Sequence, residues 1–245
     1  MRFVVVIPAR YRSVRLPGKP LVDLMGKSLV LRTYLQCAKV VPQEFIYVAT
    51  DDERIADHCR AHGMQYIMTS PDCPTGTDRV AEVATRIPAD LYVNVQGDEP
   101  LFNPGDIEVI LDAARRAPGS VLNGFAPFTD EALFRNPTIP KVVMRPDGRL
   151  LYMSRGAIPT TKRLSFEGAR RQICIYAFPP ETLRAFAAAG GKTPLESLED
   201  IEILRFLELG FEVQMVPLSD HSIAVDTPED VERVLAVLRA SASTD

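Results

Sequence analysis

The chain has 245 residues, 46% of them hydrophobic and 24% charged, so it is long enough to bury one α/β core and too apolar for a disordered chain. Its net charge of −4 argues against a nucleic-acid-binding surface, which needs a cationic excess to neutralise phosphates. The four cysteines form no C-x-x-C pair, so the sequence indicates neither a disulfide framework nor a zinc site.

The first predicted element is a buried parallel strand over residues 2–7, a nearly all-apolar run that ends at Pro8. No charged leader or cleavage site is recognisable, and no apolar stretch approaches membrane-spanning length. We therefore expect a cytoplasmic protein with no membrane partner. Residues 8–26 are rich in Arg, Pro and Gly and are predicted to form a loop at the carboxyl end of this strand. Open α/β sheets bind their ligands at that edge.

An alternation of helices and strands follows, as in α/β folds with a mostly parallel sheet. We predict helices over residues 29–40, 52–62 and 78–86, and strands over residues 45–49, 65–68 and 91–95. The last of these strands runs into the polar turn Q-G-D-E-P at residues 96–100. Pro8 and Gln96 thus mark two strand ends that deliver polar side chains to one edge of the sheet.

The middle of the chain, about residues 120–180, mixes strand-like runs with turns such as P-D-G at residues 146–148. The strand-like runs cover residues 141–144 and 173–178. We interpret this region as an antiparallel insertion that serves the acceptor site and a dimer interface. Residues 1–245 are otherwise expected to form a single domain.

The C-terminal part is predicted to contain two helices and one strand. Residues 198–209 have the spacing of one amphipathic helix that is closed by Gly210, and a strand is predicted over residues 212–216. In the last helix Thr227 is a candidate N-cap and Pro228 occupies the first helical position. Residues 240–245 are expected to be a frayed tail.

The loop after the first strand is strongly cationic. It carries Arg10, Arg12, Arg15 and Lys19, together with Gly18, which allows the backbone to approach a ligand closely. Three guanidinium groups, one ammonium and several backbone N–H groups suit a triphosphate. The alternative is a solvated basic loop, but the position directly after a buried strand favours phosphate binding. The loop has no G-x-x-x-x-G-K-[ST] pattern and is therefore not a Walker A loop.

Two aspartates follow apolar strands and are candidate metal ligands. Asp98 lies in the turn after residues 91–95, and Asp226 follows the strand over residues 212–216. Mg²⁺ in proteins typically takes one or two carboxylates and completes its shell with phosphate oxygens and water. Either aspartate alone could be a turn former or a helix cap. Together with the cationic loop they form the charge arrangement that nucleotidyl transfer requires.

Seven collinear blocks make the sequence similar to a known family. They are I-P-A-R-Y-R-S-V-R-L-P-G-K-P-L, V-A-T-D-D, T-G-T-D-R-V-A-E, V-N-V-Q-G-D-E-P, N-P-x-x-x-K-V-V, S-R-G-A-I-P and V-D-T-P-E-D. With these blocks the chain resembles the 3-deoxy-manno-octulosonate (Kdo) cytidylyltransferases over nearly its whole length. The resemblance implies a Rossmann-like nucleotide-diphospho-sugar transferase fold, a homodimer, and Mg²⁺ held by Asp98 and Asp226. It also implies transfer of CMP from CTP to an acidic acceptor, with release of pyrophosphate.

The resemblance also implies roles for individual residues. Arg10, Lys19, Asp98 and Asp226 are expected to be the catalytic residues. The expected nucleotide-binding residues are Pro8, Ala9, Arg10, Arg15, Lys19, Thr75, Gly76 and Gln96. The expected acceptor-binding residues are Arg79, Gln96, Gln172, Tyr176, Glu202 and His221, with Arg79 at the family position that binds the acceptor's carboxylate.

The acceptor side departs from the family pattern. Gln172-Ile173-Cys174 replaces His-x-Gly, Ile203 replaces Gln, and Asp220-His221-Ser222 replaces a Gly-rich turn. These changes remove hydrogen-bonding groups for a polyhydroxylated sugar. The acceptor is therefore expected to be either Kdo or a smaller, more anionic acid such as a phosphonate of the phosphonoformate type. A non-catalytic nucleotide-binding homologue is the third possibility, although such a protein has little need of two metal carboxylates.

Overall fold

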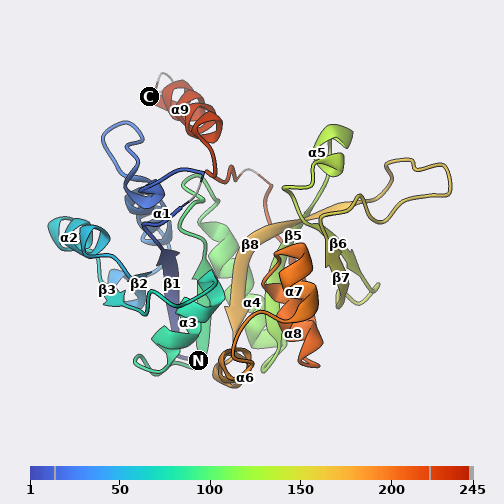
Figure 1. Cartoon of the computed structure of the whole chain (residues 1–245), viewed down its shortest axis with the longest axis horizontal. Coiled ribbons are helices and arrows are strands. Elements are labelled where there is room, and N and C mark those ends of the chain that lie inside the picture. The colour runs from blue at the N-terminus through green and yellow to red at the C-terminus, as the bar shows by residue number, and fades with distance from the viewer. Residues whose placement is uncertain (14, 221, 243–245) are drawn as a thin grey trace.

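A nine-stranded mixed sheet forms the centre of the computed structural model, which describes residues 1–13, 15–220 and 222–242. The strand order is β3-β2-β1-β4-β8-β5-β9, and the hairpin of β6 and β7 is attached to β8. Strand β8 runs antiparallel to β4 and β5, whereas the other neighbours in this order are parallel (Figure 1). The predicted α/β fold with a mixed, mostly parallel sheet is confirmed.

The elements alternate along the chain much as predicted. The strands are β1 (Phe3–Ala9), β2 (Ile46–Thr50), β3 (Tyr66–Met68), β4 (Leu91–Val95), β5 (Val121–Pro127), β6 (Lys141–Met144), β7 (Leu150–Ser154), β8 (Arg170–Phe178) and β9 (Val213–Pro217). The α-helices are α1 (Leu29–Cys37), α2 (Glu53–Ala61), α3 (Gly76–Ala84), α4 (Gly105–Arg116), α5 (Glu131–Arg135), α6 (Pro180–Ala188), α7 (Pro194–Glu199), α8 (Ile203–Glu208) and α9 (Pro228–Ala242). Two short 3-10 helices are η1 (Lys19–Leu21) and η2 (Gln43–Phe45). No helix within residues 1–13, 15–220 and 222–242 is long and apolar enough to cross a membrane.

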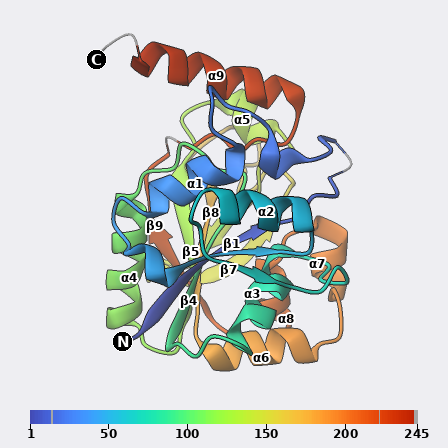
Figure 2. The ribbon, with the colours of Figure 1, turned by 90° about the vertical axis from the view of Figure 1, so that its left-hand side faces the viewer.

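Both faces of the sheet are covered by helices, which produces two separate apolar layers (Figure 2). Successive side chains of a strand point to opposite faces of the sheet. Val5 and Ile7 of β1 accordingly pack with apolar residues of α1, α2 and α4, whereas Val4 and Val6 pack with those of α3, α6 and α8. Burial on both faces explains why β1 is a continuous apolar run rather than an alternating one.

The parallel pairing of β1 and β4 brings two polar loops to one edge of the sheet. Val6 lies opposite Asn94, so both strands end at nearly the same level. The cationic loop after β1 and the acidic turn after β4 therefore lie side by side. The predicted juxtaposition of the two strand ends is confirmed.

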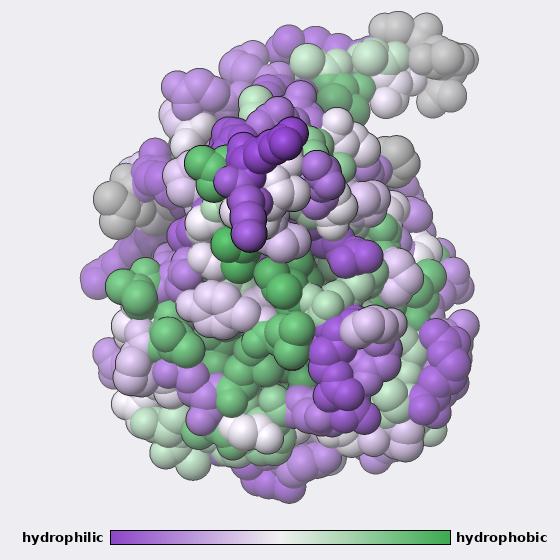
Figure 3. Space-filling model, turned by 90° about the vertical axis from the view of Figure 1, so that its right-hand side faces the viewer, coloured by the Kyte–Doolittle hydropathy of each residue, from purple (hydrophilic) through white to green (hydrophobic). Residues whose placement is uncertain are grey.

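The region predicted as an antiparallel insertion contains a hairpin and a long arm. Strands β6 and β7 pair antiparallel, β6 also pairs antiparallel with β8, and the chain between β7 and β8 extends away from the sheet (Figure 1). Three leucines of this region are exposed, Leu133 by 44%, Leu151 by 56% and Leu164 by 65%. Figure 3 shows apolar surface in the middle of this side of the molecule. The dimer interface itself remains a prediction.

The helix predicted over residues 198–209 is wrong, because two short helices, α7 and α8, occupy this part of the chain. Asp200, which ends α7, has a left-handed backbone with a φ of 51°. Ile201 and Ile203 are buried beyond this break, whereas Leu198 is 80% exposed and does not belong to the core. The apolar spacing looked continuous in the sequence because Leu198 precedes Ile201 and Leu204 at intervals of three residues, although Leu198 itself is exposed. At the C-terminus, α9 continues to Ala242, two residues beyond the predicted start of the frayed tail.

Candidate active site

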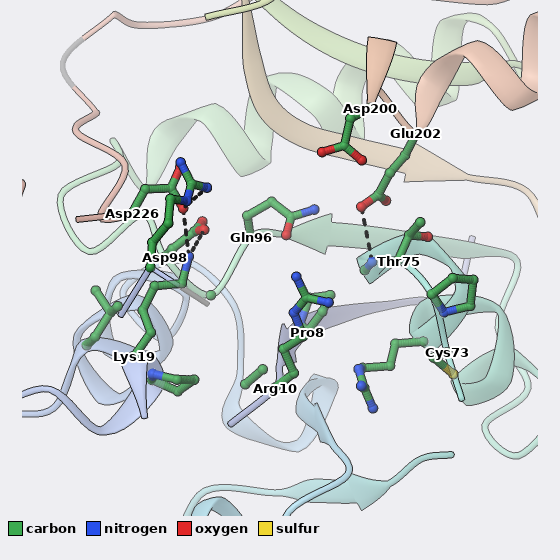
Figure 4. A pocket seen from close by; sticks show the side chains of 18 of the residues that line it. Pro8, Arg10, Lys19, Cys73, Thr75, Gln96, Asp98, Asp200, Glu202 and Asp226 are labelled. Atoms are coloured by element: carbon green, nitrogen blue, oxygen red, sulfur yellow. Dashed lines mark hydrogen bonds and ion pairs between the residues drawn. The ribbon is translucent and has the colours of Figure 1, made fainter. Parts of the chain in front are cut away.

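A cavity of about 380 Å³ lies at the carboxyl ends of β1 and β4 (Figure 4). All eight nucleotide-binding residues predicted from the sequence line it, namely Pro8, Ala9, Arg10, Arg15, Lys19, Thr75, Gly76 and Gln96. Asp98, Asp226, Arg79 and Glu202 line it as well. Figure 4 shows Asp98 and Asp226 at one end, Thr75 and Glu202 at the other, and Gln96 between them.

The ammonium of Lys19 bridges the two aspartates. Its Nζ lies 2.6 Å from Asp98 Oδ2 and 3.1 Å from Asp226 Oδ1, and Arg15 Nη2 lies 3.0 Å from the same oxygen of Asp226. Burial acts to lower the pKa of Lys19, but the charges of Asp98 and Asp226 outweigh it, and the pKa is raised. Lys19 is therefore a fully protonated cation held between two carboxylates that come from distant parts of the chain.

Backbone contacts explain why these residues meet. A Cβ atom at Gly97 would lie 2.6 Å from the carbonyl oxygen of Pro8, so only glycine lets the loop after β4 approach the end of β1 this closely. The N–H of Val225 donates a 2.9 Å hydrogen bond to the carbonyl oxygen of Asp98. This bond places Asp226, the next residue, beside Asp98.

The chemistry of this end fits a hard divalent cation. Asp98 and Asp226 both accept hydrogen bonds from the Lys19 ammonium, so the two carboxylates lie close enough to share one cation. In the part of the chain that the structure describes, no group of three or more His, Cys, Asp or Glu side chains could hold a metal ion by itself. Two carboxylates are the usual protein contribution to a Mg²⁺ that takes phosphate oxygens and water as its other ligands.

The opposite end is built on the N-terminus of α3. Thr75 caps this helix in a capping box with Asp78: the Asp78 N–H donates to Thr75 Oγ1 at 3.2 Å, and the Thr75 N–H donates to Asp78 Oδ2 at 3.1 Å. The buried Arg205 of α8 fixes Asp78 from behind, with Nη1 2.8 Å from Asp78 Oδ1, and also pairs with Glu196 at 2.6 Å. The turn before α3 is therefore anchored to α7 and α8 through charged groups.

Glu202 also contacts this helix end. Its carboxylate accepts hydrogen bonds from the backbone N–H groups of Gly76 at 3.1 Å and Thr77 at 2.8 Å. Burial raises the pKa of Glu202 and outweighs these hydrogen bonds, which act to lower it. Glu202 thus lines the cavity, but much of its hydrogen-bonding capacity is used to hold the turn at Thr75 and Gly76, and its role toward the acceptor remains a prediction.

Arg79 lines the cavity with its guanidinium already bound. Nη2 lies 3.3 Å from Asp51 Oδ2, and Nη1 donates to Thr69 Oγ1 at 2.6 Å and to the Ser70 carbonyl at 3.2 Å. These partners follow β2 and β3, and the Arg79 side chain is only 4% exposed. The Arg79 guanidinium thus already has three partners within the protein, and its role toward the acceptor remains a prediction.

Two of the other predicted acceptor residues, Gln172 and Tyr176, do not line this cavity. The Gln172 amide donates to Asn123 Oδ1 at 2.9 Å and to the Tyr176 hydroxyl at 3.2 Å. Gln172 lines a second cavity of about 520 Å³, which shares Arg15 and Asp226 with the first, whereas the buried Tyr176 lines neither. His221 lies outside the described residues.

Lys192 and Asp200 are among the lining residues that the sequence analysis missed. Lys192 Nζ lies 2.5 Å from Asp200 Oδ1, and both residues line the first cavity. Asp200 was assigned to the interior of a helix that does not exist. The pair Gly190-Gly191 before Lys192 was the available signal, because adjacent glycines predict a break between helices.

Comparison with known proteins identifies the family. A family model described as Cytidylyltransferase matches residues 4–215. The 3-deoxy-manno-octulosonate cytidylyltransferase of Protochlamydia amoebophila is 40% identical over 237 residues, which cover 94% of this chain and 91% of the relative. The enzyme of the same name from Syntrophotalea carbinolica is 41% identical over 249 residues, which cover 98% of this chain and 99% of the relative.

Solved structures agree with the sequence relatives. The structure of a CMP:2-keto-3-deoxy-manno-octonic acid synthetase complexed with CTP superposes with a TM-score of 0.91 at 34% identity, covering 98% of this chain and all 100% of that one. A cytidylyltransferase from Leptospira borgpetersenii shares the fold with a TM-score of 0.63 at 18% identity, covering 99% of this chain and 96% of that one. The predicted resemblance is confirmed, and the chain belongs to the 3-deoxy-manno-octulosonate cytidylyltransferase family.

Proposed function

We propose that this protein transfers CMP from CTP to 3-deoxy-manno-octulosonate and releases pyrophosphate. The observation that carries the proposal is the cavity end at which Arg15 and Lys19 lie against Asp98 and Asp226, at the edge of the sheet where α/β folds bind nucleotides. Cations for a triphosphate and carboxylates for its metal are the groups that nucleotidyl transfer needs. The names of the relatives supply the identity of the acceptor.

In the proposed reaction an acceptor hydroxyl attacks the α-phosphorus of CTP in line with the leaving group. A new P–O bond to the sugar acid forms as the hydroxyl loses its proton to water, the bond between the α-phosphorus and the bridging oxygen breaks, and pyrophosphate leaves toward Arg15 and Lys19. Asp98 and Asp226 hold Mg²⁺, which neutralises charge on the phosphates when it is bound. The turn at Thr75 and Gly76, fixed by Glu202, positions the nucleoside.

Kdo is proposed ahead of a small phosphonate because of where one of the sequence departures lies. Ile203 is the first residue of α8. Its side chain is buried in the apolar layer between this helix and the sheet, and it lines neither cavity. Its replacement of a polar residue therefore removes no hydrogen-bonding group from the cavity lining. Gln172 retains an amide that donates to Tyr176, so the polar network behind the second cavity is preserved.

The test is a pyrophosphate-release assay with CTP, Mg²⁺ and either Kdo or phosphonoformate. We expect kcat/KM to be higher for Kdo, with CMP-Kdo as the product. Preference for phosphonoformate would overturn the assignment of Kdo as the acceptor. CTP binding without turnover of any acidic acceptor would instead favour a non-catalytic nucleotide-binding protein.

We also propose that the protein is a homodimer that uses the region of β6, β7 and the arm between β7 and β8. This region exposes Leu151 and Leu164, and exposed apolar surface on a soluble domain commonly marks an interface. Light scattering coupled to size exclusion should give twice the 27.1 kDa chain mass. A monomeric wild-type protein would contradict the proposed dimer. A dimer that persists when Leu151→Glu and Leu164→Glu are combined would contradict the proposed interface.

A further inference from the structure

We propose that Tyr11 and Arg54 are positioning residues for CTP, because they fix the cationic loop after β1 to helix α2. The inference rests on the proposed function, since it concerns how the same site holds its nucleotide. Neither side chain lines either of the two cavities, so an effect of these residues on the nucleotide has to pass through the loop.

The cationic loop closes on itself at Tyr11 and Gly18. The Gly18 N–H donates a 3.1 Å hydrogen bond to the Tyr11 carbonyl oxygen. Gly18 has a left-handed backbone with a φ of 70°, and a Cβ atom there would lie 3.1 Å from the Tyr11 hydroxyl oxygen. The Tyr11 side chain therefore packs directly against Gly18. This contact closes the part of the loop that carries Arg15 and that directly precedes Lys19.

Arg54 contacts the same tyrosine from α2. Its guanidinium carbon lies 3.3 Å from the centre of the Tyr11 ring, which is a close cation–π contact. Asp52 orients the guanidinium, with Arg54 Nε 2.8 Å from Asp52 Oδ1 and Nη2 2.7 Å from Asp52 Oδ2. Such two-point binding fixes the plane of the guanidinium. Tyr11 is thus held by a glycine of its own loop and by an arginine of a neighbouring helix.

Asp52 in turn belongs to a well-anchored helix. It caps the N-terminus of α2, and Ile55 and Cys59 of this helix are buried in the apolar layer that α2 shares with β1. The hydrogen bond from Arg54 lowers the pKa of Asp52, burial opposes this shift, and the charge of Arg12 acts in the same direction as Arg54. The loop therefore meets α2 through the ring of Tyr11 and also through the charge of Arg12.

A second residue on the same face of α2 contacts the far end of the phosphate-binding segment, residues 11–28. His58 follows Arg54 by four residues, so the two side chains project from one side of the helix. His58 Nε2 lies 2.7 Å from Oγ of Ser28, and Ser28 caps α1. Helix α2 thus contacts this segment at both of its ends.

These contacts hold the loop without using a group of the proposed metal site. Residues 10–13 and 15–18 form neither helix nor strand, so the loop needs contacts outside itself to keep one conformation. Arg15 and Lys19 contact Asp226, which is also proposed to bind Mg²⁺. The contacts with α2 can persist when CTP and the metal bind. A loop that is ordered beforehand loses less entropy on binding, so the stack of Tyr11 and Arg54 should raise the affinity for CTP.

The first experiment is a calorimetric titration of CTP with Mg²⁺. Tyr11→Ala should weaken CTP binding about tenfold, whereas Tyr11→Phe keeps the ring and should bind within about twofold of wild type. Arg54→Ala should weaken binding about threefold. Arg60→Ala is the matched control, because Arg60 also belongs to α2 but lies over the ring of Tyr66, 5.2 Å from its centre. Wild-type affinity in Tyr11→Ala would overturn the inference.

A double-mutant cycle separates positioning from direct binding. If Arg54 acts through Tyr11, Arg54→Ala should have no further effect in the Tyr11→Ala background. A full effect in that background would show that Arg54 binds the triphosphate by its own charge, and the inference would be wrong. In steady-state kinetics the KM for CTP should rise in each single variant, while kcat and the KM for Kdo stay within about twofold of wild type.

A fluorescence measurement tests the contact itself without any substrate. The chain contains no tryptophan, so Tyr11→Trp introduces a single indole beside Arg54. Adding Arg54→Ala to this variant should shift the emission to longer wavelength, because the indole becomes more exposed to water, and adding Arg60→Ala should not. An unchanged emission after Arg54→Ala would contradict the contact. Absence of Kdo turnover by the wild type would reject the proposed function, whereas the CTP titration and the fluorescence would still decide the role of Tyr11 and Arg54.

Discussion

The two ends of the cavity are built differently. At one end Lys19, Asp98 and Asp226 follow strands of one sheet, and their charges compensate one another directly. At the other end Glu202 and Lys192 belong to short helices and the loops around them, and they act through helix caps and exposed ion pairs. The groups proposed to bind phosphate are thus fixed by the sheet register, whereas the groups predicted to face the acceptor depend on loops that can change without disturbing the core.

The largest effect is expected at the metal carboxylates. Asp98→Asn or Asp226→Asn removes a negative ligand with little change in volume, so kcat should fall roughly 10³-fold while the protein stays folded. Pyrophosphate release at saturating Mg²⁺ measures this, with Asp112→Asn on the exposed face of α4 as the control. Near-normal turnover in either variant would remove that aspartate from the metal site.

The next effect concerns the bridging cation. Lys19→Met should weaken CTP binding about tenfold or more, because the triphosphate loses an ammonium partner. Titration of CTP in the presence of Mg²⁺ is the appropriate measurement, and Lys27→Met on the exposed loop before α1 serves as control. If CTP bound with wild-type affinity, Lys19 would be a structural residue of the apo protein alone.

A smaller effect is expected for the acceptor wall. Glu202→Gln leaves one carbonyl oxygen for the N–H groups of Gly76 and Thr77 and removes the favourable charge at the start of α3. The KM for CTP should therefore rise roughly three- to tenfold, as for loss of a helix cap, and Tm should fall. Glu108→Gln on α4 is the control. An increase in the KM for Kdo alone would show that Glu202 binds the acceptor without positioning the nucleotide.

The smallest effect on activity is expected at Cys73, a lining residue near Thr75. Burial, followed by the hydrogen bond to Glu82, raises the pKa of this thiol to about 11 from an ordinary 9.0. The thiol therefore stays protonated at pH 8, and alkylation by iodoacetamide should be slow and accelerate about tenfold per pH unit toward pH 11. Cys73→Ser should transfer CMP within about twofold of the wild-type rate. Rapid alkylation at neutral pH would contradict the assigned environment.

The meeting of the cationic loop and the acidic turn could be predicted from the sequence because it depends on strand ends. Pro8 and Gln96 end continuous apolar runs, and neighbouring parallel strands necessarily end at one edge, so Lys19 and Asp98 could be brought together without coordinates. The partner of Glu202 could not be predicted, since Gly76 is 126 residues away and the contact depends on how α3 packs on the sheet. Asp200 was missed because the apolar spacing of residues 198–209 hides the break at Asp200, where the backbone is left-handed.

The hydrogen bond from Val225 to Asp98 has a consequence for the order in which the enzyme is made. Strands β1 and β4 and the first carboxylate leave the ribosome early, whereas Asp226 follows β9, the last strand of the sheet. Because N-terminal segments can fold during synthesis, much of the sheet can form around a nucleotide site that still lacks its second carboxylate. The pair of carboxylates is therefore completed only near the end of translation, when Val225 and Val234 also join the apolar cluster of Leu24 and Leu29.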